Sequence, residues 1–160
     1  MAFAAEALRV SLWDHQAEVV RDPRPFKAIC AARQTGKSLL FAVVAIWTAF
    51  ARPGSTSLVI SATEDAAKRL FRQIRDIAEG SPLLAGSVAD ATASRLRLTN
   101  GSEIICLPSS EAGAGLHGGW RPNPGRSRVH GWSTMAGGIV YRGRRGKAAG
   151  VYGIDSVGIP

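Results

Sequence analysis

Cysteine is scarce in this sequence, with two residues in a chain of 160. Cys30 and Cys106 each lie in an apolar run, which is typical of reduced thiols in a protein core. The scarcity excludes a disulfide framework or a cysteine-rich metal site as the basis of the fold, and it favours a cytoplasmic protein.

Long apolar runs are also missing. The longest, residues 39–50, has 12 residues and spans about 18 Å as a helix, whereas a bilayer requires ~20 residues. We therefore expect a buried helix that ends at Arg52-Pro53-Gly54, and no membrane partner.

Acidic residues are rare in the last quarter of the chain. Residues 1–115 carry 13 basic and 11 acidic side chains, whereas residues 116–160 carry seven and one, so most of the net charge of +8 belongs to the tail. The tail is also rich in Gly, Arg, Pro and Trp and keeps no regular period. We divide the chain into a folded part, residues 1–114, and a basic tail, residues 115–160, which we expect to be disordered.

Strands and helices alternate in the folded part. Apolar runs predict strands, and apolar residues at helical spacing predict helices. The expected strands cover residues 26–31, 57–62, 95–98 and 103–107, and the expected helices cover residues 12–21, 37–51 and 64–79. Asn100-Gly101 predicts a hairpin whose two turn positions both have positive φ. Strands joined by helices predict one α/β domain with a mainly parallel sheet.

The segment Ala-Ala-Arg-Gln-Thr-Gly-Lys-Ser, residues 31–38, lies between a predicted strand and a predicted helix. It fits the phosphate-binding loop pattern, with alanine for the first glycine. Such a loop turns backbone N–H groups toward phosphate oxygens, which Gly36 permits, and the helix dipole points at the same phosphates. Lys37 would reach the β- and γ-phosphates of ATP, and Ser38 would ligate Mg²⁺. The alternative is an ordinary strand-loop-helix turn.

The loop, with its internal Arg33-Gln34 pair, resembles that of phage terminase large subunits, the motors that package DNA into capsids. Three further segments resemble terminase segments in the same order: Leu-Trp-Asp-His-Gln at 12–16, Val-Ile-Ser-Ala-Thr at 59–63, and the Asn-Gly-Ser hairpin at 98–105 with Leu-Pro-Ser-Ser after it. The likeness covers residues ~8–113. The likeness implies the N-terminal ATPase domain of such a motor, with the RecA-like P-loop NTPase fold.

The resemblance also implies ligands and partners. The cofactors would be ATP and Mg²⁺, and the partners would be double-stranded DNA, the terminase small subunit, the portal protein and further copies of the chain. The setting would be the cytoplasm of a bacterial host carrying a phage or prophage. The residues expected to bind nucleotide are Gln16, Ala32, Arg33, Gln34, Thr35, Gly36, Lys37 and Ser38.

Particular roles follow from the resemblance for three side chains. Gln16 would hydrogen-bond adenine; the alternative is a solvated helix residue. Arg33 would act with Lys37 in catalysis by stabilising the γ-phosphate, since a cation is needed at the transferring phosphoryl group, and a surface arginine is the alternative. Trp13 fits packing better than stacking on a base.

Four basic residues of the predicted helix at 64–79 could contact DNA phosphates. They are Lys68, Arg69, Arg72 and Arg75. Acidic residues are interspersed among them, so we expect the solvated face of an amphipathic helix.

The acidic strand of a working P-loop ATPase is missing. Such a strand ends in Asp-Glu, which holds Mg²⁺ and activates water. No Asp-Glu pair follows Ser110, and the terminase nuclease cluster is not found either. Residues 150–156, with Asp155, are interrupted by glycine, lack the glutamate and come late. We therefore expect weak hydrolysis or none.

The composition of the tail suggests an origin. A bias toward Arg, Gly, Pro and Trp is what a GC-rich gene yields when it is read out of frame, so our hypothesis is a truncated or frameshifted terminase. The alternative is a genuine basic tail that binds nucleic acid by charge. For the whole chain, the alternatives are a helicase-like or DNA-repair ATPase fragment and a non-enzymatic basic DNA-binding fragment.

Overall fold

The computed structural model describes residues 3–22, 24, 26–30, 32, 34–108, 137–142 and 148–155. Its helices are a π-helical turn, η1 (Phe3–Ala7), then α1 (Asp14–Arg21), α2 (Lys37–Ala51), α3 (Glu64–Gly80) and a 3₁₀ turn, η2 (Ala85–Ser87). Its strands are β1 (Phe26–Cys30), β2 (Thr56–Ser61), β3 (Val88–Ala91), β4 (Arg95–Leu98), β5 (Glu103–Pro108), β6 (Gly137–Arg142) and β7 (Ala148–Asp155). The predicted helices and strands of residues 12–107 are all present, within two residues at each end.

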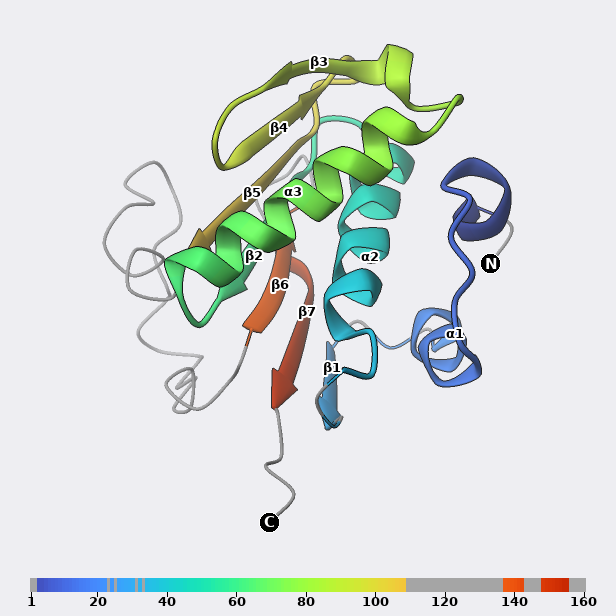
Figure 1. The fold of residues 1–160 in the computed structure, drawn as a ribbon, viewed down its shortest axis with the longest axis vertical. Helices are drawn as coiled ribbons and strands as arrows, with labels where there is room; N and C mark the ends of the chain where they lie inside the picture. The colour runs from blue at the N-terminus through green and yellow to red at the C-terminus, as the bar shows by residue number, and fades with distance from the viewer. Residues whose placement is uncertain are drawn as a thin grey trace.

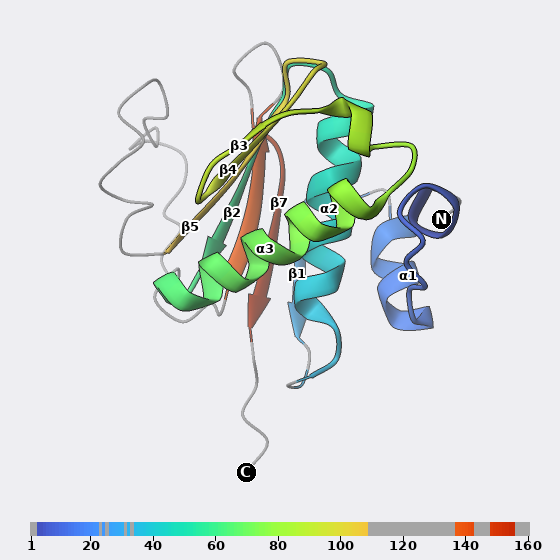
Figure 2. The same ribbon diagram turned by 45° about the horizontal axis from the view of Figure 1, so that its top comes forward.

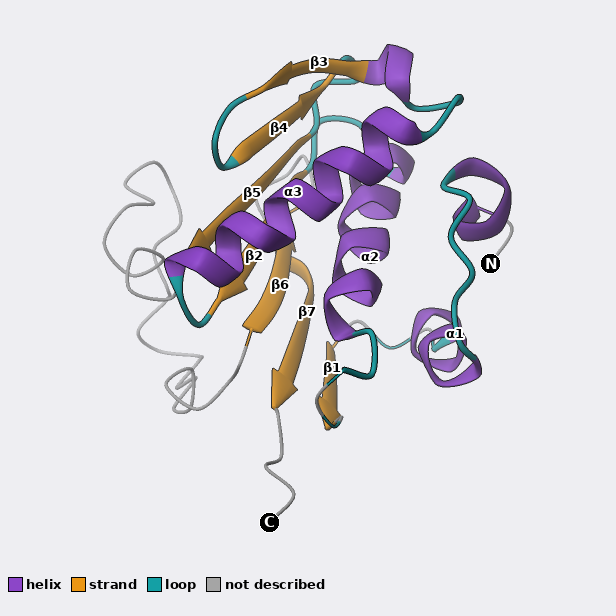
Figure 3. Cartoon of the chain, viewed as in Figure 1, coloured by secondary structure: helices purple, strands orange, loops and turns teal. Residues whose placement is uncertain are grey.

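The described strands form one mixed, open sheet with the order β1-β7-β6-β2-β5-β4-β3 (Figures 1 and 3). The pairs β1–β7 and β2–β5 are parallel, and the other four neighbouring pairs are antiparallel. The α/β fold is therefore confirmed, but the expectation of a mainly parallel sheet is wrong. The reason is that β3, β4 and β5 follow one another as a meander and that a hairpin is inserted beside β2.

That inserted hairpin, β6–β7, comes from the segment that we expected to be disordered. β6 pairs with β2 from Thr56 opposite Arg142 to Ser61 opposite Gly137, and β7 pairs with β1. The expectation of disorder is thus wrong for residues 137–142 and 148–155. Gly-Ile-Val-Tyr and Val-Tyr-Gly-Ile are rich in β-branched and aromatic residues, which favour strands once a sheet offers a place for them. The other residues of 115–160 lie outside the described ranges.

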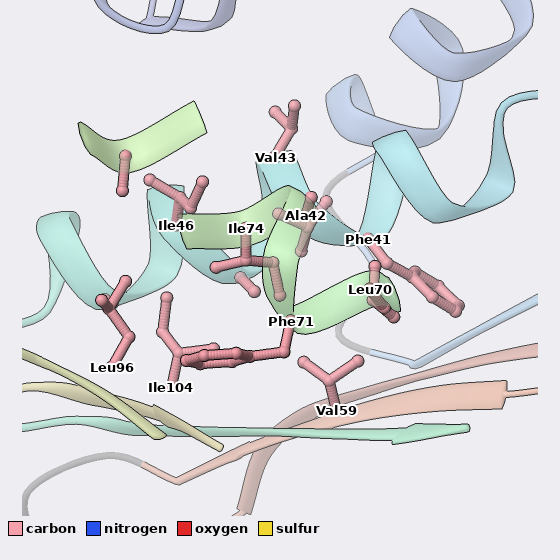
Figure 4. Close-up of a cluster of buried hydrophobic side chains, with 14 of the residues drawn as sticks. Phe41, Ala42, Val43, Ile46, Val59, Leu70, Phe71, Ile74, Leu96 and Ile104 are labelled. Carbon is pink, nitrogen blue, oxygen red and sulfur yellow. The ribbon is translucent and has the colours of Figure 1, made fainter. Parts of the chain in front are cut away.

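Helices α2 and α3 lie on the same face of the sheet (Figure 2). α2 is apolar on nearly every side because it is enclosed by α3, the sheet and the N-terminal segment. α3 is amphipathic and turns its buried residues toward α2 and β5, as its sequence spacing predicts. The buried cluster in Figure 4 includes Phe41, Ile46, Val59, Leu70, Phe71, Ile74, Leu96 and Ile104.

Cys106 is a free, buried thiol in β5. Desolvation raises the pKa of this thiol to about 12, so it stays protonated at neutral pH. The prediction of a reduced core thiol is confirmed for Cys106, whereas the side chain of Cys30 lies outside the described part. Among the helices that the structure describes, none is long and apolar enough to cross a membrane.

The predicted hairpin β4–β5 is present, but its turn differs from the prediction. Only Gly101 has a positive φ, 78°, so the connection is a three-residue loop and not a two-residue turn. The Asn100 side chain explains the difference. It donates to the carbonyl of Ala49 at 2.9 Å and accepts from the Ser102 backbone N–H at 2.9 Å. The turn therefore satisfies a carbonyl at the C-terminal end of α2, where helix carbonyls lack partners.

We predict that Asn100→Ala lowers the free energy of unfolding by about 1–3 kcal/mol, because a half-buried carbonyl and a half-buried N–H lose their partner. Thr99→Ala is the matched control, since Thr99 is exposed in the same loop. Chemical denaturation of both variants provides the measurement. Equal stabilities would contradict a capping role for Asn100.

Candidate nucleotide-binding site

The loop that fits the phosphate-binding pattern lies at the carboxyl edge of the sheet. β7 is antiparallel to β6, and β6 is antiparallel to β2, so β1, β7, β2 and β5 all run in one direction. Their last residues are Cys30, Asp155, Ser61 and Pro108. Figure 1 shows the connection from β1 to α2 at the same end of the molecule as the arrowhead of β7. Open α/β sheets bind ligands at this edge.

The backbone of the loop turns through two residues in the left-handed region. Gln34 has a φ of 62° and Gly36 a φ of 73°. Gly36 is also the N-cap of α2, so the left-handed turn leads directly into the helix. A non-glycine residue such as Gln34 adopts this conformation only when its surroundings hold it there.

Two side chains of the loop region converge on one carbonyl. The Thr35 hydroxyl donates to the Ala32 carbonyl at 2.9 Å, and the Lys37 ammonium donates to the same oxygen. Lys37 is therefore folded against the loop. Ser38 is exposed in the first turn of α2. The placement of Arg33 lies outside the described residues, so its proposed role at the γ-phosphate stays a prediction.

Helix α1 contacts the loop through two consecutive residues. The Nε2 atom of His15 donates to the carbonyl of Thr35 at 3.1 Å, and the Nε2 amide of Gln16 donates to the carbonyl of Gly36 at 2.9 Å. The Gln16 side chain is 2% exposed, so the alternative of a solvated helix glutamine is wrong. Its contact with adenine stays a prediction.

We expected Trp13 to pack in the core or at its edge; at 58% exposed it is not a core residue. Its position explains this, because Trp13 is the N-cap of α1, ahead of the helix face that packs on the protein. Its ring lies edge-on to the His15 ring at a centroid distance of 5.5 Å.

Asp155 is the residue that the sequence reading set aside. It ends β7, in register with Cys30 at the end of β1, so the backbone places an acidic residue beside the strand that leads into the loop. The sequence pattern that could have indicated it is an apolar run that ends in aspartate. The glycines within that run made it look unlike a strand. Over the described ranges, no group of three or more His, Cys, Asp or Glu side chains is arranged to hold a metal ion.

A shallow, open groove lies along α3 and reaches Leu39 in the first part of α2. It has a volume of about 600 Å³ and is lined by Leu39, Arg69, Arg72, Gln73, Asp76 and Ile77. The four basic residues of α3 differ in their partners. Lys68 pairs with Glu64 at 2.6 Å and Arg75 pairs with Asp76 at 3.6 Å, whereas Arg69 and Arg72 form no ion pair within the described part of the chain.

Comparison with models of known protein families finds no match for this sequence, and a search of curated proteins finds none either.

We predict that Gly36→Ala lowers the free energy of unfolding by about 1–3 kcal/mol, for two reasons. The residue has a left-handed φ, and a Cβ atom there would lie 2.3 Å from Nε2 of Gln16. Gly80→Ala is the control, because nothing lies within 4 Å of a Cβ atom at Gly80. Denaturant unfolding of the two variants tests this, and equal stability would rule out a close contact at Gly36.

Proposed function

We propose that this chain binds ATP with Mg²⁺ through residues 31–38 and is the ATP-binding part of a terminase large subunit, the ATP-driven motor that packages phage DNA. One observation supports this most. The pattern Ala-Arg-Gln-Thr-Gly-Lys-Ser coincides with a left-handed turn that enters a helix at the carboxyl edge of an α/β sheet. In this proposal the fold is a RecA-like P-loop NTPase.

The contacts of the loop suggest how nucleotide binds. Lys37 now donates to the Ala32 carbonyl, and a phosphate oxygen would replace that neutral acceptor with a charged one. The first turn of α2 adds backbone N–H groups and the positive end of the helix dipole. Ser38, exposed beside Lys37, would contribute its hydroxyl to Mg²⁺. Magnesium would neutralise charge on the phosphates and orient them.

Hydrolysis is the weaker part of the proposed activity. Asp155 is the one acidic residue in 116–160, and its backbone ends the strand beside β1. Ser156 follows it, where motors of this class carry the glutamate that activates water. We propose that the chain binds nucleotide and turns it over slowly or not at all.

Lys37→Ala tests the proposal. Loss of a charged hydrogen bond to the phosphates should weaken Mg-ATP binding on the order of 10- to 100-fold. Lys68→Ala is the control, since it removes an equal charge from an exposed ion pair on α3. Titration calorimetry with and without Mg²⁺ is the measurement. Equal ATP affinity for wild type and Lys37→Ala would refute nucleotide binding at this loop.

Double-stranded DNA is the proposed macromolecular partner, and the terminase small subunit, the portal protein and further copies of the chain complete the motor. The groove on α3 is the described surface best suited to DNA. Arg69 and Arg72 line it together with Asp76 and form no ion pair within the described residues, so we propose that these two arginines contact DNA phosphates. Arginine forms paired hydrogen bonds with phosphate.

Two double variants distinguish a contact in the groove from general charge attraction. Arg69→Ala with Arg72→Ala should weaken DNA binding and lower the slope of log affinity against log salt by roughly two. Lys68→Ala with Arg75→Ala removes the same charge from the same helix but from residues already in ion pairs. Fluorescence anisotropy at several salt concentrations measures both. Equal losses would mean diffuse attraction and would favour the non-enzymatic DNA-binding alternative.

A further inference from the structure

Gln16 uses both ends of its amide within the protein. The Oε1 atom accepts the Trp13 backbone N–H at 2.9 Å, which closes the first turn of α1 in the manner of a capping box. The Nε2 atom donates to the Gly36 carbonyl at 2.9 Å. The side chain is 2% exposed. A glutamine that reads a nucleotide base must present its amide edge to the ligand, and this amide edge faces the loop.

Gln16 contacts the loop at Gly36, where the loop ends and α2 begins. The carbonyl of Gly36 accepts the Gln16 amide and also the Leu40 N–H at 3.0 Å, which is the first hydrogen bond of α2. The carbonyl just before it, of Thr35, accepts the Nε2 N–H of His15 at 3.1 Å. Two consecutive residues of α1 therefore hold two consecutive carbonyls, 20 residues further along the chain.

Fixing these carbonyls also fixes the direction of the N–H groups beside them. In each peptide unit the C=O and the following N–H point in opposite directions along one rigid plane. A carbonyl of Thr35 or Gly36 held toward α1 turns the N–H groups of Gly36 and Lys37 away from α1. These N–H groups belong to the loop and helix start that would face phosphate. The left-handed φ of Gln34, which is not a glycine, needs such an external restraint nearby.

We propose that Gln16, assisted by His15, is a positioning residue that sets the shape of the phosphate loop from α1 and that it contributes to phosphate affinity without reading the base. This inference rests on the proposed function, because it concerns the ligand of the same loop. The resemblance implies that Gln16 hydrogen-bonds adenine, and the positioning role proposed here replaces that expectation.

The inference predicts a loss of affinity that is independent of the base. Gln16→Ala should weaken binding of ATP, GTP and inorganic tripolyphosphate, each with Mg²⁺, by the same factor of roughly five to ten, because one hydrogen bond that holds the loop is lost. If Gln16→Ala folds poorly, the same affinities can be measured for Gln16→Met, because methionine fills a similar volume without the amide. Thr99→Ala, at an exposed position in the loop between β4 and β5, is the control and should leave all three affinities unchanged. A loss confined to ATP would overturn the proposal.

A second measurement needs no ligand. Amide hydrogen exchange at Leu40, whose N–H donates to the Gly36 carbonyl at 3.0 Å, should become faster in Gln16→Ala and in His15→Ala, and should not change in Thr99→Ala. Unchanged exchange in the two α1 variants would overturn the positioning role even if the chain bound no nucleotide. If wild type and Lys37→Ala bind ATP equally while exchange does respond to Gln16, the proposed function fails and the positioning role stands.

Discussion

The arrangement of the sheet, the helices and the candidate site depends on the burial of α2. This helix is apolar on nearly all sides, and it fills the space between the sheet and α3, so its axis cannot shift without opening the core. Its first residue, Lys37, follows the loop, and its last turn receives the amide of Asn100. The position of the candidate site is thus a consequence of packing some distance away. The contacts from α1 act on an end that the core has already placed.

Local features of the sequence predicted most of residues 12–107. The helix at 37–51 follows from an apolar run bounded by glycine on one side and Arg-Pro-Gly on the other, and α3 follows from its 3.6-residue spacing. β3 was missed because its four residues are largely exposed and carry no alternation. β6 and β7 were missed because their partners are distant in sequence. No local feature of the sequence near residue 150 indicates that this segment pairs with the strand that begins at Phe26.

The candidate site was predicted unevenly for the same reason. The motif located the loop, because the residues that it needs are adjacent in sequence. The partner of Gln16 could not be predicted, since its side chain reaches across 20 residues to a carbonyl, and any residue type has a carbonyl. Asp155 was set aside because glycines interrupt its segment, because no glutamate follows it and because it comes late in the sequence. The sheet tolerates those glycines because β6 and β1 hydrogen-bond to the strand from both sides.

The insertion of β6 and β7 has a consequence for how the chain folds. β1 is at one edge of the described sheet and pairs only with β7, so the strand that carries the loop joins β2 through a hairpin from the far end of the sequence. During synthesis β1 emerges first and β7 last. The described sheet therefore cannot form completely until the residues up to 155 have left the ribosome, and its pairings of high contact order make that step slow. Before then, β1 presents open edges to other chains, which makes the nascent state prone to aggregation.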